Sequence, residues 1–199
     1  GYYIFGPETT FGIENESQLR MVSDFVSLFR AAGFVPGVKI GDDRADVRMV
    51  TNVSLPDESY HLAVTTKKIR IEASSDAGFF YALQSLRQLL PPAVEGDGLD
   101  MAMDCRVPAV TISDRPRFGY RGLMVDVSRF FMPKQNLLRI IDAASFLKIN
   151  KLHLHLVDDN GWRLEIKRYP RLTQVGAWRV KRDEPFPNRR NPERGEPVP

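Results

Sequence analysis

The stretch "GLMVDVSRFFMPKQNLLRIIDAASFLKINKLHLHLVDD", residues 122–159, decides the fold of the second half of the chain. It begins with a short apolar run suited to a strand buried on both faces, continues with apolar residues at helical spacing, and ends in a second apolar run. Pro133 stands where the helix would begin, a position that tolerates the missing N–H of proline. Strand, helix and strand within about 35 residues predict a βαβ unit with two parallel strands.

Polar side chains follow both predicted strands. Gly122–Ser128 leads to Arg129, and Lys151–Val157 leads to Asp158 and Asp159. The carboxyl ends of parallel strands meet at one edge, where the sites of α/β sheets and barrels lie. The planar fork of Arg129 suits vicinal hydroxyls or a carboxylate, and Asp158 could hold it rigid through a bidentate pair. From spacing alone, a surface salt bridge explains Arg129 equally well.

Two histidines on the second strand raise the question of a metal. His153 and His155 are two residues apart, so they share one face of a strand and could both be ligands. Leucines occupy the other face and the strand is expected to be buried, which favours core imidazoles hydrogen-bonded to their neighbours. We therefore predict no metal and no cofactor.

The residues after this strand form a turn-rich loop. Asp158 and Asp159 are adjacent at a strand end, where one side chain is expected to point inward and the other to cap the loop. Asn160-Gly161 predicts a turn. Trp162 either lines a binding pocket or packs beneath the loop, and packing is the favoured interpretation.

Residues 1–114 predict an α+β domain that contains an antiparallel sheet and two helices. Four segments alternate or are β-branched: "ADVRMVTN" (45–52), "SYHLAVTT" (59–66), "KKIRIEAS" (67–74) and "VPAVTISD" (107–114). The short "TTKK" between the second and third predicts a hairpin. One helix is expected around Leu19–Phe29, with Ser17 as N-cap and Gly33 ending the turn after it; the other runs from Asp76 to the prolines at Pro91.

Composition excludes several classes of protein. The 199 residues are 43% hydrophobic and 27% charged, which is ordinary for a globular chain. The net charge of +3 is too small and too dispersed to predict a nucleic-acid partner. No apolar run approaches the roughly 20 residues that cross a bilayer. The single Cys105 excludes an internal disulfide, and the neighbouring Asp104 is expected to raise its pKa, so we predict a half-buried, unreactive thiol.

The motifs "RGLMVDVSR" (121–129) and "HLHLVDDNGWR" (153–163), in this order with a helix between them, resemble the opening of the catalytic barrel of family 20 glycoside hydrolases, the β-N-acetylhexosaminidases. The segment 59–90 is similar to the α+β domain that precedes the barrel in that family. The resemblance covers nearly the whole chain. It implies an accessory α+β domain over residues 1–114 and the first βαβ portion of a (β/α)₈ barrel over residues 115–199.

The resemblance also implies roles for three residues. Arg129 is expected to bind hydroxyls of a terminal N-acetylglucosamine or N-acetylgalactosamine, Asp158 to orient the site, and His155 to assist it. Residues 159–162 are then loop architecture. These are the positions that the ends of the two strands had already indicated.

The catalytic residues of the family have no counterpart in the motifs found here. In that family the 2-acetamido carbonyl of the sugar attacks the anomeric carbon, while an adjacent Asp-Glu pair stabilises that group and protonates the leaving oxygen. Asp183-Glu184 lacks the glycines and the preceding apolar strand of that motif, so no catalytic residue is assigned. A complete barrel needs ~250 residues, so we expect this chain to be an N-terminal fragment, inactive in isolation, of an exo-acting retaining enzyme.

Two other classes of protein stay open. One is a non-catalytic carbohydrate-binding or scaffold protein with a degenerate barrel, and the other is a related barrel glycosidase that acts on uronic acids. The first residues, "GYYIFGPET", lack the pattern of a signal peptide. An exported location, periplasmic or extracellular, is expected from the usual location of members of that family and from the near absence of cysteine. The sequence does not define the oligomeric state.

Overall fold

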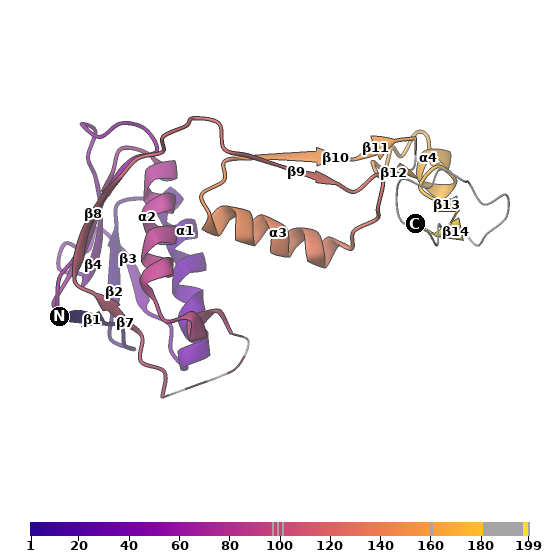
Figure 1. The fold of residues 1–199 in the computed structure, drawn as a ribbon. Helices are drawn as coiled ribbons and strands as arrows, with labels where there is room; N and C mark the ends of the chain where they lie inside the picture. The colour runs from indigo at the N-terminus through magenta and orange to yellow at the C-terminus, as the bar shows by residue number, and fades with distance from the viewer. Residues whose placement is uncertain (97, 99, 101, 160, 181–196, 199) are drawn as a thin grey trace. The chain divides into compact units, whose positions relative to one another are not determined.

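The computed structural model describes residues 1–96, 98, 100, 102–159, 161–180 and 197–198. The chain divides into two compact units, Gly1–Gly119 and Tyr120–Pro199. Figure 1 shows both units, with most of their helices and strands labelled. Within the described ranges, none of the helices combines the length and the apolarity that crossing a bilayer would require.

The first unit is built on a six-stranded sheet with the strand order β3-β2-β4-β6-β5-β8. Its strands are β2 (Thr10–Ile13), β3 (Gly37–Ile40), β4 (Val47–Thr51), β5 (Tyr60–Val64), β6 (Ile69–Ala73) and β8 (Val110–Asp114). β1 (Tyr2–Ile4) and β7 (Arg106–Pro108) pair antiparallel in a separate small sheet. The four predicted strands are present as β4, β5, β6 and β8.

The six-stranded sheet is mixed, so the prediction of an antiparallel sheet is wrong for part of it. β2 runs parallel to both β3 and β4, and β4 runs parallel to β6. The predicted hairpin of β5 and β6 is antiparallel, and β8 pairs antiparallel with β5. The hairpin inserts β6 between β4 and β5. The turn sequence predicts only the local pairing of β5 with β6. It does not predict the pairing of β6 with the more distant β4.

Both predicted helices of the first unit are present, as α1 (Glu16–Ser27) and α2 (Asp76–Leu89). The N-cap of α1 is Asn15, whose side chain accepts a hydrogen bond from the N–H of Gln18 at 3.0 Å. The prediction of Ser17 is wrong, because a cap needs the extended backbone that Asn15 has (φ −156°), whereas Ser17 lies inside the first turn.

Short 3₁₀ turns follow both helices. η1 (Leu28–Ala32) continues α1 and ends, as predicted, at Gly33, whose φ of 83° lies in the left-handed region that favours glycine. η2 (Pro92–Glu95) begins directly after Pro91, where α2 has ended. The chain then leads through residues 96–105 to β7.

Helices α1 and α2 cover one face of the sheet (Figure 1), and the core of the first unit lies between them and the strands. Phe11 on β2 and Phe29 on η1 are fully buried, and each ring centroid lies 5.8 Å from that of Phe25 on α1. Burying a side chain of this size contributes about 1.5–3 kcal/mol. Arg70 and Glu72 of β6 lie on the uncovered face, as the alternation of that strand predicts, and there they form an ion pair at 2.6 Å.

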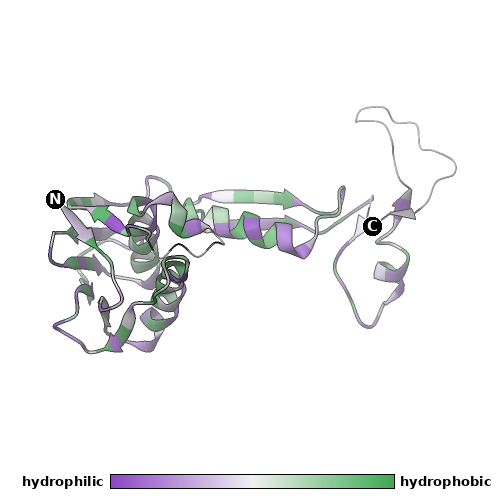
Figure 2. Ribbon diagram, turned by 90° about the horizontal axis from the view of Figure 1, so that it is seen from below, coloured by the Kyte–Doolittle hydropathy of each residue, from purple (hydrophilic) through white to green (hydrophobic). Residues whose placement is uncertain are grey.

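The second unit opens with the predicted βαβ unit. β9 (Gly122–Asp126) and β10 (Lys151–His155) are parallel, with α3 (Lys134–Phe146) between them in sequence. Figure 2 shows apolar residues along both strands and on the helix. The expected burial of β9 on both faces is not observed in the described residues, since Met124 is 54% exposed and α3 has no buried residue. Two strands and one helix cover only one another.

Smaller elements complete the second unit. β11 (Val157–Asp158) and β12 (Gly161–Trp162) form an antiparallel pair directly after β10. They are followed by α4 (Arg171–Gln174) and by the antiparallel pair of β13 (Arg179–Val180) and β14 (Pro197–Val198).

Gly78, in the first turn of α2, allows the helix to approach the sheet closely. A Cβ atom there would lie 2.5 Å from the carbonyl oxygen of Ser59 and 2.9 Å from the Cβ of Ala73. We expect Gly78→Ala to lower the free energy of unfolding by about 1–3 kcal/mol, because the helix must shift to relieve the overlap. Chemical denaturation measures the effect. Gly6→Ala, which meets nothing within 4 Å, is the control; equal stability of Gly78→Ala and wild type would contradict this packing.

Candidate functional site

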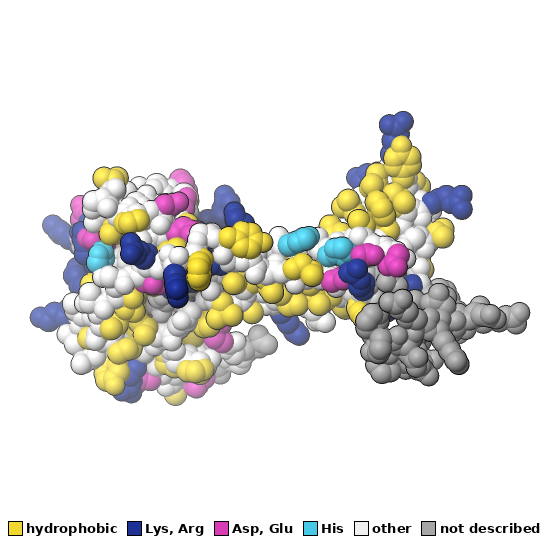
Figure 3. Space-filling model, turned by 45° about the horizontal axis from the view of Figure 1, so that its top comes forward, with side chains coloured by type: hydrophobic (Ala, Val, Ile, Leu, Met, Phe, Trp, Pro, Cys, Tyr) yellow, Lys and Arg dark blue, Asp and Glu magenta, His cyan; other side chains and the backbone are white. Residues whose placement is uncertain are grey.

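The carboxyl ends of β9 and β10 lie side by side. The register pairs Asp126, the last residue of β9, with His155, the last residue of β10. The N–H of Val127 extends this pairing by donating to the carbonyl of His155 at 3.2 Å. The segments that follow the two strands therefore start at neighbouring points. In Figure 3, histidine, acidic and basic side chains gather on the surface of the second unit.

Arg129 bridges the two strand ends. Its Nη1 atom lies 2.5 Å from Oδ2 of Asp126, and its Nη2 atom lies 2.7 Å from Oδ2 of Asp158. Nε2 of His155 lies 2.8 Å from the same Asp158 oxygen. The structure thus brings Arg129, Asp158 and His155 together, at the rim where the sequence predicted them. The Arg129 side chain remains 50% exposed, so part of its donor surface faces solvent.

Asp126 is a member of this cluster that the sequence reasoning missed. Its Oδ1 atom accepts hydrogen bonds from the N–H groups of Ser128 and Arg129, both at 3.0 Å, while Oδ2 holds the Arg129 guanidinium. One carboxylate therefore fixes both the backbone and the side chain of Arg129. The available signal was an aspartate three residues before an arginine at a strand end, since short acidic side chains commonly bond the N–H groups that follow them.

The cluster favours the ionised form of both carboxyl groups. The N–H of Asp159, the imidazole of His155 and the positive charge of Arg129 together lower the pKa of Asp158 to about 2. The pKa of Asp126 is also lowered, chiefly by the N–H of Arg129 and then by its guanidinium. The same contacts raise the pKa of Arg129, with Asp126 as the largest cause. The three charges are mutually stabilised across the range in which enzymes work.

His153 stands apart from this cluster. Its side chain is exposed and His155 is only half-buried, so the expectation of two core imidazoles is wrong, although His155 is hydrogen-bonded to a neighbour as expected. The two ring centroids lie 6.4 Å apart. Within the described parts of the chain, no group of three or more histidine, cysteine or acidic residues is arranged to hold a metal ion.

The loop beyond Asp158 folds back as the pair β11–β12, in which Asp158 faces Gly161. Trp162 is half-buried, and its Nε1–H donates to the carbonyl of Leu164 at 2.6 Å, in agreement with a packing role. Asn160, part of the predicted turn, and the pair Asp183-Glu184 lie outside the described residues.

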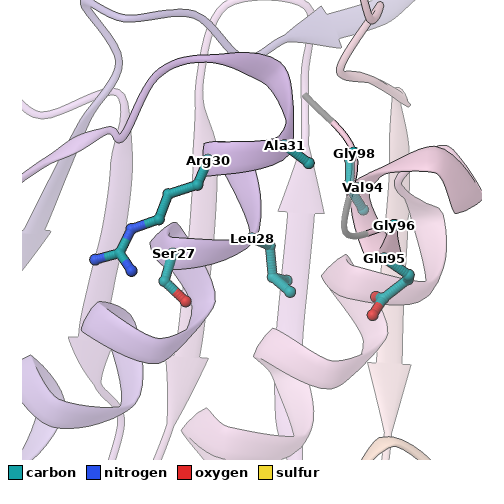
Figure 4. Close-up of a pocket in the computed structure, with 8 residues that line it drawn as sticks. All are labelled: Ser27, Leu28, Arg30, Ala31, Val94, Glu95, Gly96 and Gly98. Carbon is teal, nitrogen blue, oxygen red and sulfur yellow. The ribbon is translucent and has the colours of Figure 1, made fainter. Parts of the chain in front are cut away.

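The first unit contains a cavity of a different kind. It has a volume of about 370 Å³, lies between η1 and η2, and is shown in Figure 4. The carboxylate among its lining residues, Glu95, is bound by Arg87 through two hydrogen bonds of 2.7 and 2.6 Å. Cys105 in the same unit is 1% exposed, more deeply buried than predicted, and burial followed by the charge of Asp104 raises its pKa. Neither feature indicates chemistry.

The geometry of the strand-end cluster suits a polyhydroxylated ligand. A guanidinium offers hydrogen-bond donors in one plane, and carboxylates beside it offer acceptors. A sugar hydroxyl can accept a hydrogen bond from the guanidinium and donate one to a carboxylate. The parallel βαβ unit, with this cluster at the carboxyl ends of its strands, has the arrangement of an active site in an α/β catalytic domain.

Comparison with known families identifies the group. The family model "Glycosyl hydrolase family 20, domain 2" matches residues 2–115, and "Glycosyl hydrolase family 20, catalytic domain" matches residues 118–194. The chain belongs to glycoside hydrolase family 20, a family of β-N-acetylhexosaminidases, which confirms the resemblance noted in the sequence.

Individual relatives agree with this assignment. The chain is 46% identical over 135 residues to a β-hexosaminidase of Vibrio furnissii, which covers 68% of this chain and 21% of the relative. It is 46% identical over 119 residues to the N,N'-diacetylchitobiase of Vibrio harveyi, covering 60% and 12%. A mutant Streptomyces plicatus β-hexosaminidase in complex with its product GlcNAc superposes with a TM-score of 0.80 and 35% identity, covering 88% of this chain and 35% of that structure. The chain thus spans about a fifth of the length of the first relative.

The ionisation of Asp158 offers a direct test of the cluster. Its pKa in the folded chain, about 2, lies below the value of about 3.9 for an unfolded aspartate. The contribution of this group to stability is therefore complete above pH 4 and is lost as the pH falls towards 2. We expect His155→Phe to raise the pKa of Asp158, because one hydrogen bond to the carboxylate is lost. NMR titration of the Asp158 carboxyl carbon measures it.

His153→Phe is the matched control, because this imidazole makes no hydrogen bond with Asp158 in the described structure. The pKa of Asp158 should be the same in this variant as in wild type. An equal shift in both variants would show that the imidazole of His155 has no specific contact with the carboxylate.

Proposed function

We propose that the protein to which this chain belongs is an exo-acting, retaining β-N-acetylhexosaminidase that releases terminal N-acetylhexosamine from glycans. The observation that carries this proposal is the guanidinium of Arg129, held between Asp126 and Asp158 at the carboxyl ends of two parallel strands. The relatives support it, since they are β-hexosaminidases and a chitobiase, and one solved structure holds GlcNAc.

In this proposal Arg129 donates hydrogen bonds to hydroxyl groups of the terminal sugar. Asp158 holds the guanidinium in place and can accept from a neighbouring hydroxyl, and His155 fixes the orientation of Asp158. Because Asp126 and Asp158 occupy part of its fork, the Arg129 side chain has few rotamers left to lose when the sugar binds. This preorganisation is the contribution of the present residues to catalysis.

The proposed reaction is substrate-assisted. The carbonyl oxygen of the 2-acetamido group attacks the anomeric carbon as the glycosidic bond breaks, a carboxylic acid protonates the leaving oxygen, and water then opens the cyclic intermediate with retention of configuration. We assign neither catalytic carboxyl group to a residue of this chain. Export to the periplasm or the cell exterior, where such glycans occur, is part of the same proposal.

Substitution of Arg129 tests the proposed role. A hydrogen bond to a charged donor is worth about 1.5–3 kcal/mol, so we expect Arg129→Ala to lower kcat/KM for an aryl N-acetylglucosaminide about 10- to 100-fold in the full-length protein. Arg139→Ala, an exposed position on α3, is the control and should change kcat/KM less than twofold. Equal rates for Arg129→Ala and wild type would refute the role; a wild-type protein that binds the sugar without turnover would favour the non-catalytic alternative.

The 199-residue chain provides a second test. We expect it to release no chromophore from the same aryl N-acetylglucosaminide, because the acid and the acetamido-stabilising carboxylate of the proposed mechanism have no counterpart in the motifs of this chain. The assay compares the purified chain with a buffer blank. Turnover above the blank would show that these residues already contain a complete catalytic apparatus.

A further inference from the structure

The guanidinium of Arg163 lies against backbone carbonyls instead of a carboxylate. Nε donates to the carbonyl of Val127 at 3.0 Å, Nη2 to that of Ser128 at 3.3 Å, and Nη1 to that of Ala177 at 2.5 Å. We propose that Arg163 is a positioning residue that fixes the backbone from which Arg129 projects. The expected effect of Arg163 on kcat/KM rests on the proposed function. Its expected effect on the position of the Arg129 backbone rests on these contacts alone.

The residues bound by Arg163 directly precede Arg129. The carbonyls of Val127 and Ser128 accept hydrogen bonds from the guanidinium, and the hydroxyl of the fully buried Ser128 donates to the carbonyl of Gly161 at 2.7 Å. On the other side, the N–H of Arg129 donates to Asp126. The segment is thus held from both sides, so that the Cα of Arg129 has little freedom. A displacement of even about 1 Å in such a segment can cost two orders of magnitude in rate.

The surroundings of Arg163 explain why a charged donor is used. Burial, and then the nearby charge of Arg179, lowers the pKa of Arg163. Within the described residues it forms no ion pair; the ring of Phe131, whose centroid lies 5.4 Å from Cζ, covers the guanidinium. A charge in such a place is unfavourable unless its donors are satisfied. The three carbonyls accept one hydrogen bond from each guanidinium nitrogen, and charge-assisted hydrogen bonds are about twice as strong as neutral ones.

Gly161 makes room for this arrangement. A Cβ atom at Gly161 would lie 2.8 Å from Nη2 of Arg163 and 3.0 Å from the carbonyl oxygen of Ser128. Any side chain at this position would therefore push the guanidinium away from the carbonyl. Gly161→Ala should therefore have the same effect on kcat/KM as Arg163→Ala, although the arginine is retained.

A double-mutant cycle on the full-length protein tests the inference. With an aryl N-acetylglucosaminide as substrate, we expect Arg163→Ala to lower kcat/KM at least 10-fold when Arg129 is present, and less than twofold in an Arg129→Ala background, because the two residues act as a unit. Gly161→Ala should follow Arg163→Ala, and the exposed control Arg168→Ala should change kcat/KM less than twofold. The same fold loss in both backgrounds, or no loss in either, would overturn the inference.

If Arg163→Ala does not fold, as judged by its circular dichroism, Arg163→Lys takes its place in the double-mutant cycle. Lysine retains the charge but cannot donate to three carbonyls in one plane. The same non-additivity with Arg129→Ala is therefore expected, and additive losses would overturn the inference.

Amide hydrogen exchange in the 199-residue chain separates this inference from the proposed function. We expect Arg163→Ala to speed exchange of the Arg129 backbone N–H at least 10-fold relative to wild type, whereas Arg168→Ala leaves it unchanged. If the full-length protein hydrolyses no N-acetylhexosaminide but this exchange increases, the proposed function fails and the positioning role stands. Unchanged exchange in Arg163→Ala overturns the positioning role, whatever the enzymatic result.

Discussion

The parallel pairing of β9 and β10 in one register is the constraint on which the candidate site depends. It places Asp126 beside His155, so that the three residues leading to Arg129 and the three leading to Asp158 start from the same edge. A shift of one residue in this register would turn the alternate side chains to the opposite face. The ion pair of Arg129 with Asp158 could not then form, and the guanidinium would lose one of the two carboxylates that hold it.

Local patterns predicted much of the fold, because they report which face of an element is buried. The spacing of apolar residues identified α1, α2 and the βαβ unit. The alternation in β6 identified the face of that strand that points to solvent. The parallel pairs of β2 with β3 and β4 were not predicted, since pairing between distant strands depends on the whole sheet and not on any one segment. The N-cap of α1 was misplaced by two residues for a similar reason: serine and asparagine are both good caps, and only the backbone dihedrals distinguish them.

The site was predictable where a residue follows a strand and obscure where its role depends on tertiary contacts. Arg129 and Asp158 were candidates because the carboxyl ends of parallel strands meet at one edge, although spacing alone explained Arg129 equally well as a surface salt bridge. Asp126 was read as part of an apolar strand, although its carboxylate binds both the backbone and the side chain of Arg129. Arg163 closes the second family motif, but its role was not predicted, because the carbonyls of Val127 and Ser128 that it binds lie 36 and 35 residues away in the sequence.

The charges of the site bear on the kind of sugar that it can bind. Two carboxylates, both with lowered pKa, flank one guanidinium, so the cluster of Asp126, Asp158 and Arg129 carries a net charge of −1. A uronic acid would bring a further negative charge close to Asp158 and would compete with that carboxylate for Arg129. Repulsion between like charges in a partly desolvated site would weaken the binding of such a sugar. A neutral sugar meets no such repulsion, since its hydroxyls accept from the exposed half of the guanidinium and donate to the carboxylates. This electrostatic argument therefore supports the uncharged terminal sugar of the proposed function over the uronic-acid alternative.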